Sequence, residues 1–593
     1  MRSYIRRAAV ISGAAALVLS GTVTAPAFAN QNEEPTPVQL LSITDFHGQL
    51  TPGNGKSGEL VTSDGEVFPA GGAAYLASHL DSVRDAENSI FFSTGDNFSG
   101  WPSTVRVHND EPTIEFMNHV GLQFTTLGNH ELDVSEEFLI DHMAKGKCYG
   151  TIGVDSCFTN SQGEQFTGSG FDYFSGNLVT ADKSKSVLPA TNVVRVEGHQ
   201  GRQPVGFINL MLPSTQDGQK LNNSYQPHLV TRDIVESANE YAVKLRQQGV
   251  RAIVLNLHEG ALTSGGFNEC KDVSNWLVDL NERLSADIDA ILGGHRHKAI
   301  NCSLEDPEGN PRPVVTAASQ GRVINEINLQ LDPDTGEVLR EATTSENHAV
   351  TRDVQPDAEV QDMVDYWVDK EAETRSISIG EISGDISSVR DASGESSIHN
   401  LTADAYMEDA NNGAMKRYNA KYKHRKEGYA DFAVSAEKPG AGLAFDKDGM
   451  ISFGEAWNAV GSHVGIMSTA VSGEHFDRIL EAQWRTDASG KVIFHPLAVS
   501  DEVQYFYDGS RPVGDRVDTD TITIAGKPID EDAQYRVATR VRTVFGDRTG
   551  FAEAFEGSTD PVRHSRSRDA FRWYLQTNSP VKPPALDRVS PVD

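Results

Sequence analysis

Hydrophobic residues in the first half of the chain form short apolar blocks that alternate with longer amphipathic segments. Blocks of strand type occupy 38–44, 90–94, 253–257 and 288–292, and segments of helix type occupy 73–83 and 234–245. Strands that alternate with helices along a chain are typical of layered α/β proteins. The pattern therefore predicts a layered α/β domain that extends to about residue 347.

A helical pattern follows this region and separates it from a second one. After Pro356, apolar residues recur on one face of a predicted helix, at Val360, Met363, Val364, Trp367 and Val368. Helix patterns mixed with short strands follow, and the residues after Ser579 are rich in proline. We therefore expect five segments: a leader (1–29), a first domain (36–347), a connecting helix (355–376), a second domain (377–578) and a tail (579–593).

The leader has the features of a secretory signal. Arginines at positions 2, 6 and 7 precede an apolar stretch from Ala8 to Leu19, and Ala27-Phe28-Ala29 forms a small-residue cleavage pattern. We expect cleavage near Ala29 and a secreted, extracellular or cell-envelope protein. An uncleaved membrane anchor is the alternative, but the apolar stretch is short for a span. No second long apolar run is present, so we expect no membrane span in the mature chain.

Composition and charge narrow the class of protein. The chain has 593 residues, of which 38% are hydrophobic and 23% charged, and a net charge of −32. These values indicate a globular protein with more than one domain. A surface this acidic opposes unspecific binding of nucleic acid, so we expect no nucleic-acid partner.

The four cysteines allow three disulfide pairings in an exported chain. Proximity in the sequence favours Cys148 with Cys157 and Cys270 with Cys302. Free buried thiols are the alternative, which export disfavours.

Metal-binding residue types follow five of the apolar blocks. They are Asp45-Phe46-His47, Gly95-Asp96-Asn97, Gly128-Asn129-His130-Glu131-Leu132-Asp133, His258-Glu259-Gly260 and Gly293-Gly294-His295-Arg296-His297. Ligands bind at the carboxyl ends of strands in open α/β sheets, so these residues are expected to converge at one edge. Histidines buried for packing are the structural alternative, but they would not be expected to gather after strands and beside glycines.

The predicted donor set suits two divalent ions. Carboxylate, amide and imidazole donors together favour Zn, Mn, Fe or Co over Ca or Mg. Seven candidate ligands are too many for one tetrahedral ion and are enough for two ions that share a carboxylate. A pair of ions can activate water and clamp the oxygens of a displacement at phosphorus. The sequence therefore predicts phosphoester hydrolysis.

These motifs, in this order, resemble the calcineurin-like metallophosphatases, specifically the exported 5'-nucleotidase and UDP-sugar hydrolase group. The resemblance implies a four-layer α/β/β/α sandwich followed by a mixed α+β substrate domain. It also implies that Asp45, His47, Asp96 and His297 hold one ion and that Asp96, Asn129, His258 and His295 hold the other. His130 and Asp133 resemble the catalytic pair of that family, in which the imidazole stabilises charge on the phosphoryl group and the carboxylate orients the ring.

The second half of the chain resembles the substrate domain of the same family, but the motifs of its nucleoside pocket are not recognisable. Arg390, Glu395, Asn400 and Asp404 follow one family pattern, and Tyr535-Arg536-Val537-Ala538-Thr539 follows a late strand. The phosphate and base-stacking motifs are replaced by 437–444, 461–464 and 542–551. Lys438, His463, Arg542 and Arg548 are candidate replacements for binding an anionic group, with solvated surface positions as the alternative.

Three functions remain open on the sequence. The first is a secreted phosphohydrolase that releases phosphate from nucleotides or related small phosphoesters. The second keeps the metal site but acts on a non-nucleoside phosphomonoester, a cyclic nucleotide or a nucleotide sugar. The third is a non-enzymatic secreted binding protein, which the intact set of donors argues against.

Overall fold

The first domain is built on two six-stranded sheets that pack face to face.

The structure is a computed structural model that describes residues 34–592, except 86, 100–101, 199–200, 214–219, 222–223, 226–227, 413–428, 437, 439, 447, 461–463, 488 and 547–549. The leader and its cleavage site therefore lie outside the described residues, as do His463 and Arg548. Within the part of the chain that is described, no helix is long and apolar enough to cross a membrane.

One sheet carries the first three metal-binding motifs. Its strand order is β18-β17-β1-β4-β5-β6, with β1 parallel to β4, β4 parallel to β5, and β17 antiparallel to β1. The strands are β1 (Thr36–Ile43), β4 (Ser89–Ser93), β5 (Phe124–Thr126), β6 (Asp172–Phe174), β17 (Val323–Leu331) and β18 (Thr344–Ala349).

The other sheet carries the two remaining motifs. Its order is β15-β16-β14-β13-β9-β8, and β9, β13, β14 and β16 run parallel. The strands are β8 (Thr191–Val196), β9 (Gln203–Met211), β13 (Ala252–His258), β14 (Ala290–Gly293), β15 (Ala299–Glu305) and β16 (Pro311–Ala317).

Three layers of apolar side chains hold the sheets and helices together. Leu40, Phe92 and Phe207 belong to the core between the two sheets. Outside the first sheet, a second core packs α1 (Ala73–Val83), α3 (Glu111–His119) and α6 (Ala358–Ser376), and outside the second sheet a third core packs α4 (Ile234–Gln247) and α5 (Asn275–Arg283). The result is the four-layer α/β/β/α sandwich that the resemblance implied.

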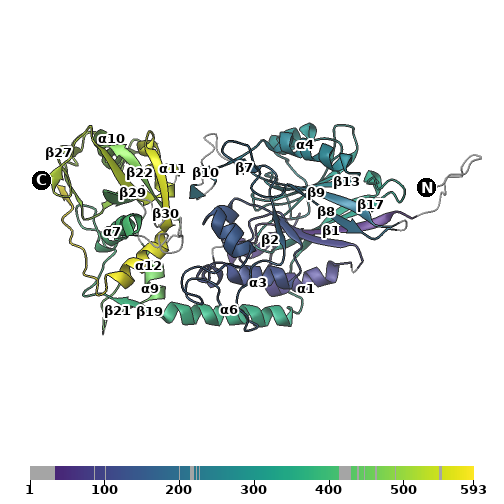
Figure 1. Cartoon of the computed structure of the whole chain (residues 1–593), viewed down its shortest axis with the longest axis horizontal. Coiled ribbons are helices and arrows are strands. Elements are labelled where there is room, and N and C mark those ends of the chain that lie inside the picture. The colour runs from purple at the N-terminus through teal and green to yellow at the C-terminus, as the bar shows by residue number, and fades with distance from the viewer. Residues whose placement is uncertain are drawn as a thin grey trace, which may run out of the picture.

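Helix α6 leads from the first domain to the second, and Figure 1 shows it lying along the edge of the first domain and ending beside α9. The Asp357 side chain caps its N-terminus by accepting a hydrogen bond from the Val360 amide at 2.8 Å. Met363, Val364 and Trp367 are buried, as the apolar pattern predicted, whereas Val368 is 39% exposed. Trp367 also donates to Glu115 of α3 at 2.6 Å, which fastens the helix to the first domain.

The second domain is mixed α+β, as expected. A five-stranded sheet has the order β25-β20-β29-β22-β30, and a four-stranded sheet has the order β28-β27-β26-β31. Their strands are β20 (Phe432–Ser435), β22 (Gly465–Ser472), β25 (Ala498–Val499), β26 (Val503–Tyr507), β27 (Val517–Ile524), β28 (Lys527–Pro528), β29 (Gln534–Arg540), β30 (Thr559–Arg566) and β31 (Val589–Pro591). The helices are α7 (Ser397–Asn412), α9 (Phe453–Val460), α10 (Gly473–Glu481), α11 (Val541–Phe545) and α12 (Ser567–Thr577).

Both disulfides pair as sequence proximity favoured. Cys148 is bonded to Cys157 and Cys270 to Cys302, with Cα–Cα distances of 5.5 and 5.0 Å. The second bridge joins the segment that follows β13 to β15, so it closes a loop that contains His295 and His297. In the chain-entropy model a loop of this size contributes roughly 4 kcal/mol to stability.

The residues after Ser579 do not form the tail that the proline content suggested. Strand β31 pairs parallel to β26, and Val589 is buried. Arg588 is 3% exposed and forms two hydrogen bonds of 2.8 Å with the carboxylate of Asp404 on α7. It also donates to the Val499 carbonyl at 2.8 Å. Proline content alone could not reveal a buried arginine whose partner lies 184 residues away.

Replacing Arg588 with methionine should destabilise the second domain. Asp404 would stay buried without its counter-charge, and breaking a buried pair of this kind costs about 3–5 kcal/mol. Differential scanning calorimetry should show a lower melting temperature for Arg588→Met and an unchanged one for Asp587→Asn, which alters an exposed neighbour. Equal melting temperatures would mean that the pairing of the last residues does not stabilise the domain.

Candidate metal centre

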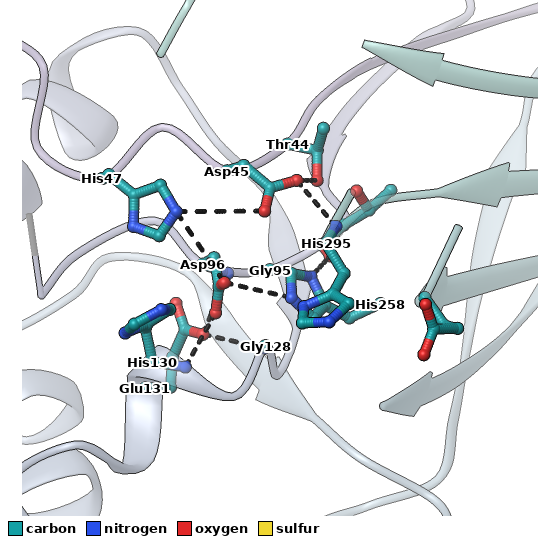
Figure 2. A network of polar contacts seen from close by, with 12 residues as sticks. Thr44, Asp45, His47, Gly95, Asp96, Gly128, His130, Glu131, His258 and His295 are labelled. Carbon is teal, nitrogen blue, oxygen red and sulfur yellow. Dashed lines mark hydrogen bonds and ion pairs between the residues drawn. The ribbon is translucent and has the colours of Figure 1, made fainter. Parts of the chain in front are cut away.

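The predicted donors converge where the carboxyl ends of the two sheets meet. Asp45 follows β1, Asp96 follows β4 and Asn129 follows β5, while His258 ends β13 and His295 follows β14. The two edges are bonded directly, because the His295 amide donates to Asp45 Oδ2 at 2.9 Å and Thr94 Oγ1 donates to the Gly293 carbonyl at 2.9 Å. Figure 2 shows Asp45, His47, Asp96, His258 and His295 pointing toward one another.

Three overlapping groups of donors have their ligand atoms within 4.8 Å of one another. They are Asp45, His47 and His297; His47, Asp96 and His130; and Asp96, His258 and His295. Asp96 belongs to two of them, and its Oδ2 lies 3.1 Å from His258 Nε2 and 3.8 Å from His47 Nε2. The structure therefore places Asp96 between the other donors.

The backbone of this site is unusual. Asp45, His47, Asp96, His295 and His297 all have positive φ angles, between 48° and 69°. Left-handed conformations of residues other than glycine cost about 1–3 kcal/mol each and gather at functional sites. Five strained residues among seven predicted ligands indicate that the loops are shaped by the site.

Donor atoms in the cluster point at one another in a way that suits a cation. His258 Nδ1 lies 2.6 Å from the Thr94 carbonyl, so a proton on that nitrogen leaves Nε2 as a lone pair facing Asp96. His47 Nε2 and His297 Nε2 lie 3.1 Å apart, and Asp45 Oδ1 is 3.3 Å from His297 Nε2. Lone pairs that face each other repel unless a proton or a metal ion lies between them.

Asn129 provides an independent test of whether the residues fit a metal. The side chain is 3% exposed, and its Oδ1 has no hydrogen-bond partner among the described residues. Buried amide oxygens are normally satisfied, so an exception needs an explanation. A cation beside Asn129 supplies it, and the mixed donor set is that of a borderline divalent ion.

The electrostatics of the cluster reflect two buried carboxylates. Burial alone would lower the pKa of His258, but the charges of Asp96 and Asp45 raise it to about 10. Burial lowers the pKa of His47 to about 4, against the attraction of Asp96 and Asp45. The pKa values of the two rings therefore shift in opposite directions, because the carboxylate charges outweigh burial at His258 and burial outweighs them at His47.

His130 and Asp133 lie at one end of this cluster. His130 Nδ1 is 2.6 Å from Asp133 Oδ2, and the His130 amide donates to Asp96 Oδ1 at 2.8 Å. Burial lowers the pKa of His130, but the charges of Asp133 and Asp96 prevail and raise it to about 9. The imidazole is therefore positively charged at neutral pH, with its Nδ1–H donated to Asp133.

Glu131 has a role that sequence reasoning did not assign, although it lies inside the Gly-Asn-His-Glu motif. Its carboxylate is fully buried and accepts hydrogen bonds from the amides of Asp96 (2.9 Å), Asn97 (2.8 Å) and Gly128 (2.8 Å). Two loops that carry predicted ligands are thereby fixed to one side chain. The presence of a glutamate in the motif could have indicated this role, but the three amides that it binds are known only from the structure.

The residues of the second domain that follow the family's substrate pattern contact one another and the C-terminal segment. Asn400 donates to Glu395 at 2.7 Å, and Glu395 accepts from the Val589 amide at 3.1 Å. These residues hold the C-terminal segment. Lys438 is exposed, whereas Arg542 lies on α11, where its charge acts on Arg106.

One hydrogen bond between the two domains was not predicted from any sequence motif. Arg563 of the second domain donates to the Asp133 carbonyl of the first domain at 2.8 Å.

Comparison with known proteins agrees with this architecture. Residues 39–299 match the calcineurin-like phosphoesterase family, and residues 378–555 match the C-terminal domain of 5'-nucleotidase. The structure is similar to the NAD nucleotidase of Haemophilus influenzae (15% identity) and to a putative 5'-nucleotidase of Staphylococcus aureus (17% identity). Each likeness has a TM-score of 0.55 and covers 94% of this chain and 100% of the other. These likenesses confirm the fold.

Among curated relatives, the endonuclease YhcR of Bacillus subtilis is 24% identical over 76% of this chain, and the cell wall protein Lmo0130 of Listeria monocytogenes is 26% identical over 55%. The matched regions span only 33% and 41% of those proteins.

Replacing Glu131 with glutamine should weaken the binding of divalent cations. A carboxamide has one acceptor oxygen, so it cannot accept all three amides, and the loops of Asp96 and Asn129 would lose their common anchor. Outer-shell changes of this kind typically reduce metal affinity about 10- to 100-fold. Metal titration of Glu131→Gln should show this loss, and Glu137→Gln, outside the site, should bind as the unaltered chain does. Equal affinities would refute the anchoring role.

Proposed function

We propose that this chain, which belongs to the calcineurin-like metallophosphatases of the 5'-nucleotidase family, is a secreted hydrolase of small phosphoesters with two divalent ions in its site. The observation that supports the proposal is the clustering of donors from both sheets, since Asp45, His47 and His297 have their ligand atoms within 4.8 Å of one another, and so do Asp96, His258 and His295. Nucleotides are the leading substrate class because both domains of the family are present.

The residues divide into two ligand sets. One ion is assigned to Asp45, His47, Asp96 and His297 and the other to Asp96, Asn129, His258 and His295. When bound, such a pair of ions supplies Lewis acidity that activates water and neutralises phosphoryl charge. The orphaned oxygen of Asn129 and the facing nitrogens of His47 and His297 support this assignment.

His130 is assigned to stabilising the phosphoryl group. Its Nε2 is the ring atom left to donate to a substrate oxygen, because Nδ1 is held by Asp133 at 2.6 Å. A positively charged donor is stronger than a neutral one where negative charge develops. Asp133 keeps the ring in this orientation and is itself tied to the second domain through Arg563.

A second candidate keeps the same chemistry but changes the substrate to a non-nucleoside phosphoester, a cyclic nucleotide or a nucleotide sugar. It is favoured by the sequence of the second domain, which reads Arg542 near the second position where the family pattern has an aromatic residue that stacks on the base. Location outside the cell is supported by the leader pattern and by the two disulfides.

Replacing His130 with alanine should separate catalysis from metal binding. We expect turnover of p-nitrophenyl phosphate to fall by roughly two to three powers of ten, because a donor to the transition state is lost. Metal content should stay intact in His130→Ala but fall in Asp96→Asn, which should lose both. His119→Ala, at an exposed position, is the control. Full turnover by His130→Ala would rule out the assigned role.

A substrate panel tests the nucleotide assignment. Release of phosphate from AMP should be measured beside UDP-glucose, cyclic nucleotides and p-nitrophenyl phosphate, all with the metal-loaded protein. We expect AMP to be hydrolysed. Activity on p-nitrophenyl phosphate without activity on AMP would contradict the nucleotide assignment and favour the second candidate. Fewer than one bound ion per chain after refilling would instead favour a binding protein.

A further inference from the structure

A pocket between the two domains concentrates positive charge in an otherwise acidic protein. Four arginines line it, one from α2 (Ser103–Arg106) of the first domain and three from the second domain: Arg106, Arg566, Arg568 and Arg572. Only two carboxylates, Asp155 and Asp569, line the same pocket, which leaves two positive charges in excess. We call this site the arginine pocket. In a chain of net charge −32, such a local excess is a feature that needs a ligand or a partner to explain it.

Two of the arginines are fixed in place by ion pairs. Arg566 Nε lies 2.6 Å from Asp569 Oδ2, and Arg566 Nη2 donates to Asn109 of the first domain at 2.7 Å. Arg572 Nη2 lies 2.9 Å from Asp155 Oδ1, again across the domain boundary. These contacts hold the pocket walls together and account for both of its carboxylates.

Arg106 is the residue whose side chain most clearly points to a ligand. Its Nε and Nη2 are buried and have no hydrogen-bond partner among the described residues. Burial and repulsion from Arg566 and Arg542 lower the pKa of Arg106 to about 10, although Asp110 and Asp133 act in the opposite direction. A buried guanidinium with two unused donors carries a desolvation penalty that an anion would offset.

Arg568 completes the positive wall. Its guanidinium lies 3.6 Å from the centre of the Trp457 ring, which fixes its plane by a cation–π contact. Burial, with repulsion from Arg106 and Arg540, lowers the pKa of Arg568 to about 9. Arg106 and Arg568 therefore repel each other from opposite domains, and a shared anion would convert this repulsion into attraction.

The arginine pocket borders the candidate metal centre at the end where His130 lies. Helix α2 follows the loop of Asp96 in the chain, and the charge of Asp133 acts on Arg106. Three residues before Arg566, Arg563 donates to the Asp133 carbonyl at 2.8 Å. The arginine pocket therefore offers positive charge to a second anionic group of a small molecule whose first phosphate lies beside His130.

We propose that the arginine pocket binds a second, non-scissile phosphate, so that the substrate is a small molecule with two separate phosphate groups. A phosphate offers several acceptor oxygens and about two negative charges, which match the excess charge and the forked donors of Arg106 and Arg568. This inference rests on the proposed function for the scissile phosphate. It gives an electrostatic contact to a chain in which the base-stacking motifs of the family pattern are not recognisable.

The test compares matched pairs of compounds on the full metal-loaded chain. Adenosine 3',5'-bisphosphate is set against AMP, and fructose 1,6-bisphosphate against fructose 6-phosphate. We expect kcat/KM to be at least about tenfold higher for the bisphosphate of at least one pair, as two charge-assisted contacts would give. Arg106→Gln and Arg568→Gln should each reduce this ratio about fivefold or more. Arg283→Gln, an exposed arginine on α5, should leave the ratio unchanged.

Calorimetric titration of the full chain without metal provides a readout that is independent of hydrolysis. The preferred bisphosphate should bind more tightly than its monophosphate and than inorganic phosphate, and Arg106→Gln should abolish the difference. If no phosphoester is hydrolysed but this selective binding is found, the proposed function fails and the pocket assignment stands. A ratio near one in both kcat/KM and binding overturns the inference. Inorganic phosphate that binds as tightly as the bisphosphate also overturns it, because the pocket would then hold a free anion.

Discussion

The burial of Asp45 and Asp96 at the meeting edge of two sheets is the constraint on which the rest of this structure depends. Both carboxylates are almost completely buried, and Glu131 adds a third within hydrogen-bond reach of the same loops. Negative charges so close together need positive charge in the same small volume. In the protein alone, His258 and His130 supply it by holding protons. A pair of divalent ions would take the place of the proton on His258, which must be neutral to act as a ligand.

The residues that surround the donors hold the donor side chains in fixed positions. Glu131 anchors three amides, the Thr94 carbonyl lies 2.6 Å from His258 Nδ1, and Asp133 holds His130. Each contact leaves the functional atom of its partner pointing into the cluster. The left-handed backbone at Asp45, Asp96 and His295 is tolerated because these bonds, together with the packed sheets behind them, determine the loop conformation. The strained backbone of the ligand loops therefore depends on the hydrogen bonds that anchor those loops.

The sequence predicted the parts of this site that depend on local pattern. Strand-length apolar blocks followed by Asp45, Asp96 and His258 placed these residues at one sheet edge, because parallel strands share their carboxyl ends. What it could not predict depends on distant partners. The buried pair of Arg588 and Asp404 turned an expected tail into a strand, and the contact of Arg563 with the Asp133 carbonyl joins residues 430 positions apart. No periodicity or motif encodes such pairs.

Arginines of the second domain contact the first domain, although the chain as a whole is strongly acidic. A net charge of −32 repels phosphoesters at long range, so capture must come from fields confined to the site. Arg563, Arg566 and Arg572 of the second domain reach the first domain by a hydrogen bond or an ion pair. Their partners there are the Asp133 carbonyl, Asn109 and Asp155, respectively. The second domain therefore brings positive charge to the surface of the first domain that it contacts. Because the described part of the arginine pocket draws on both domains, its attraction for anions requires the two domains to remain docked, and docking becomes a condition for recognition as well as for stability.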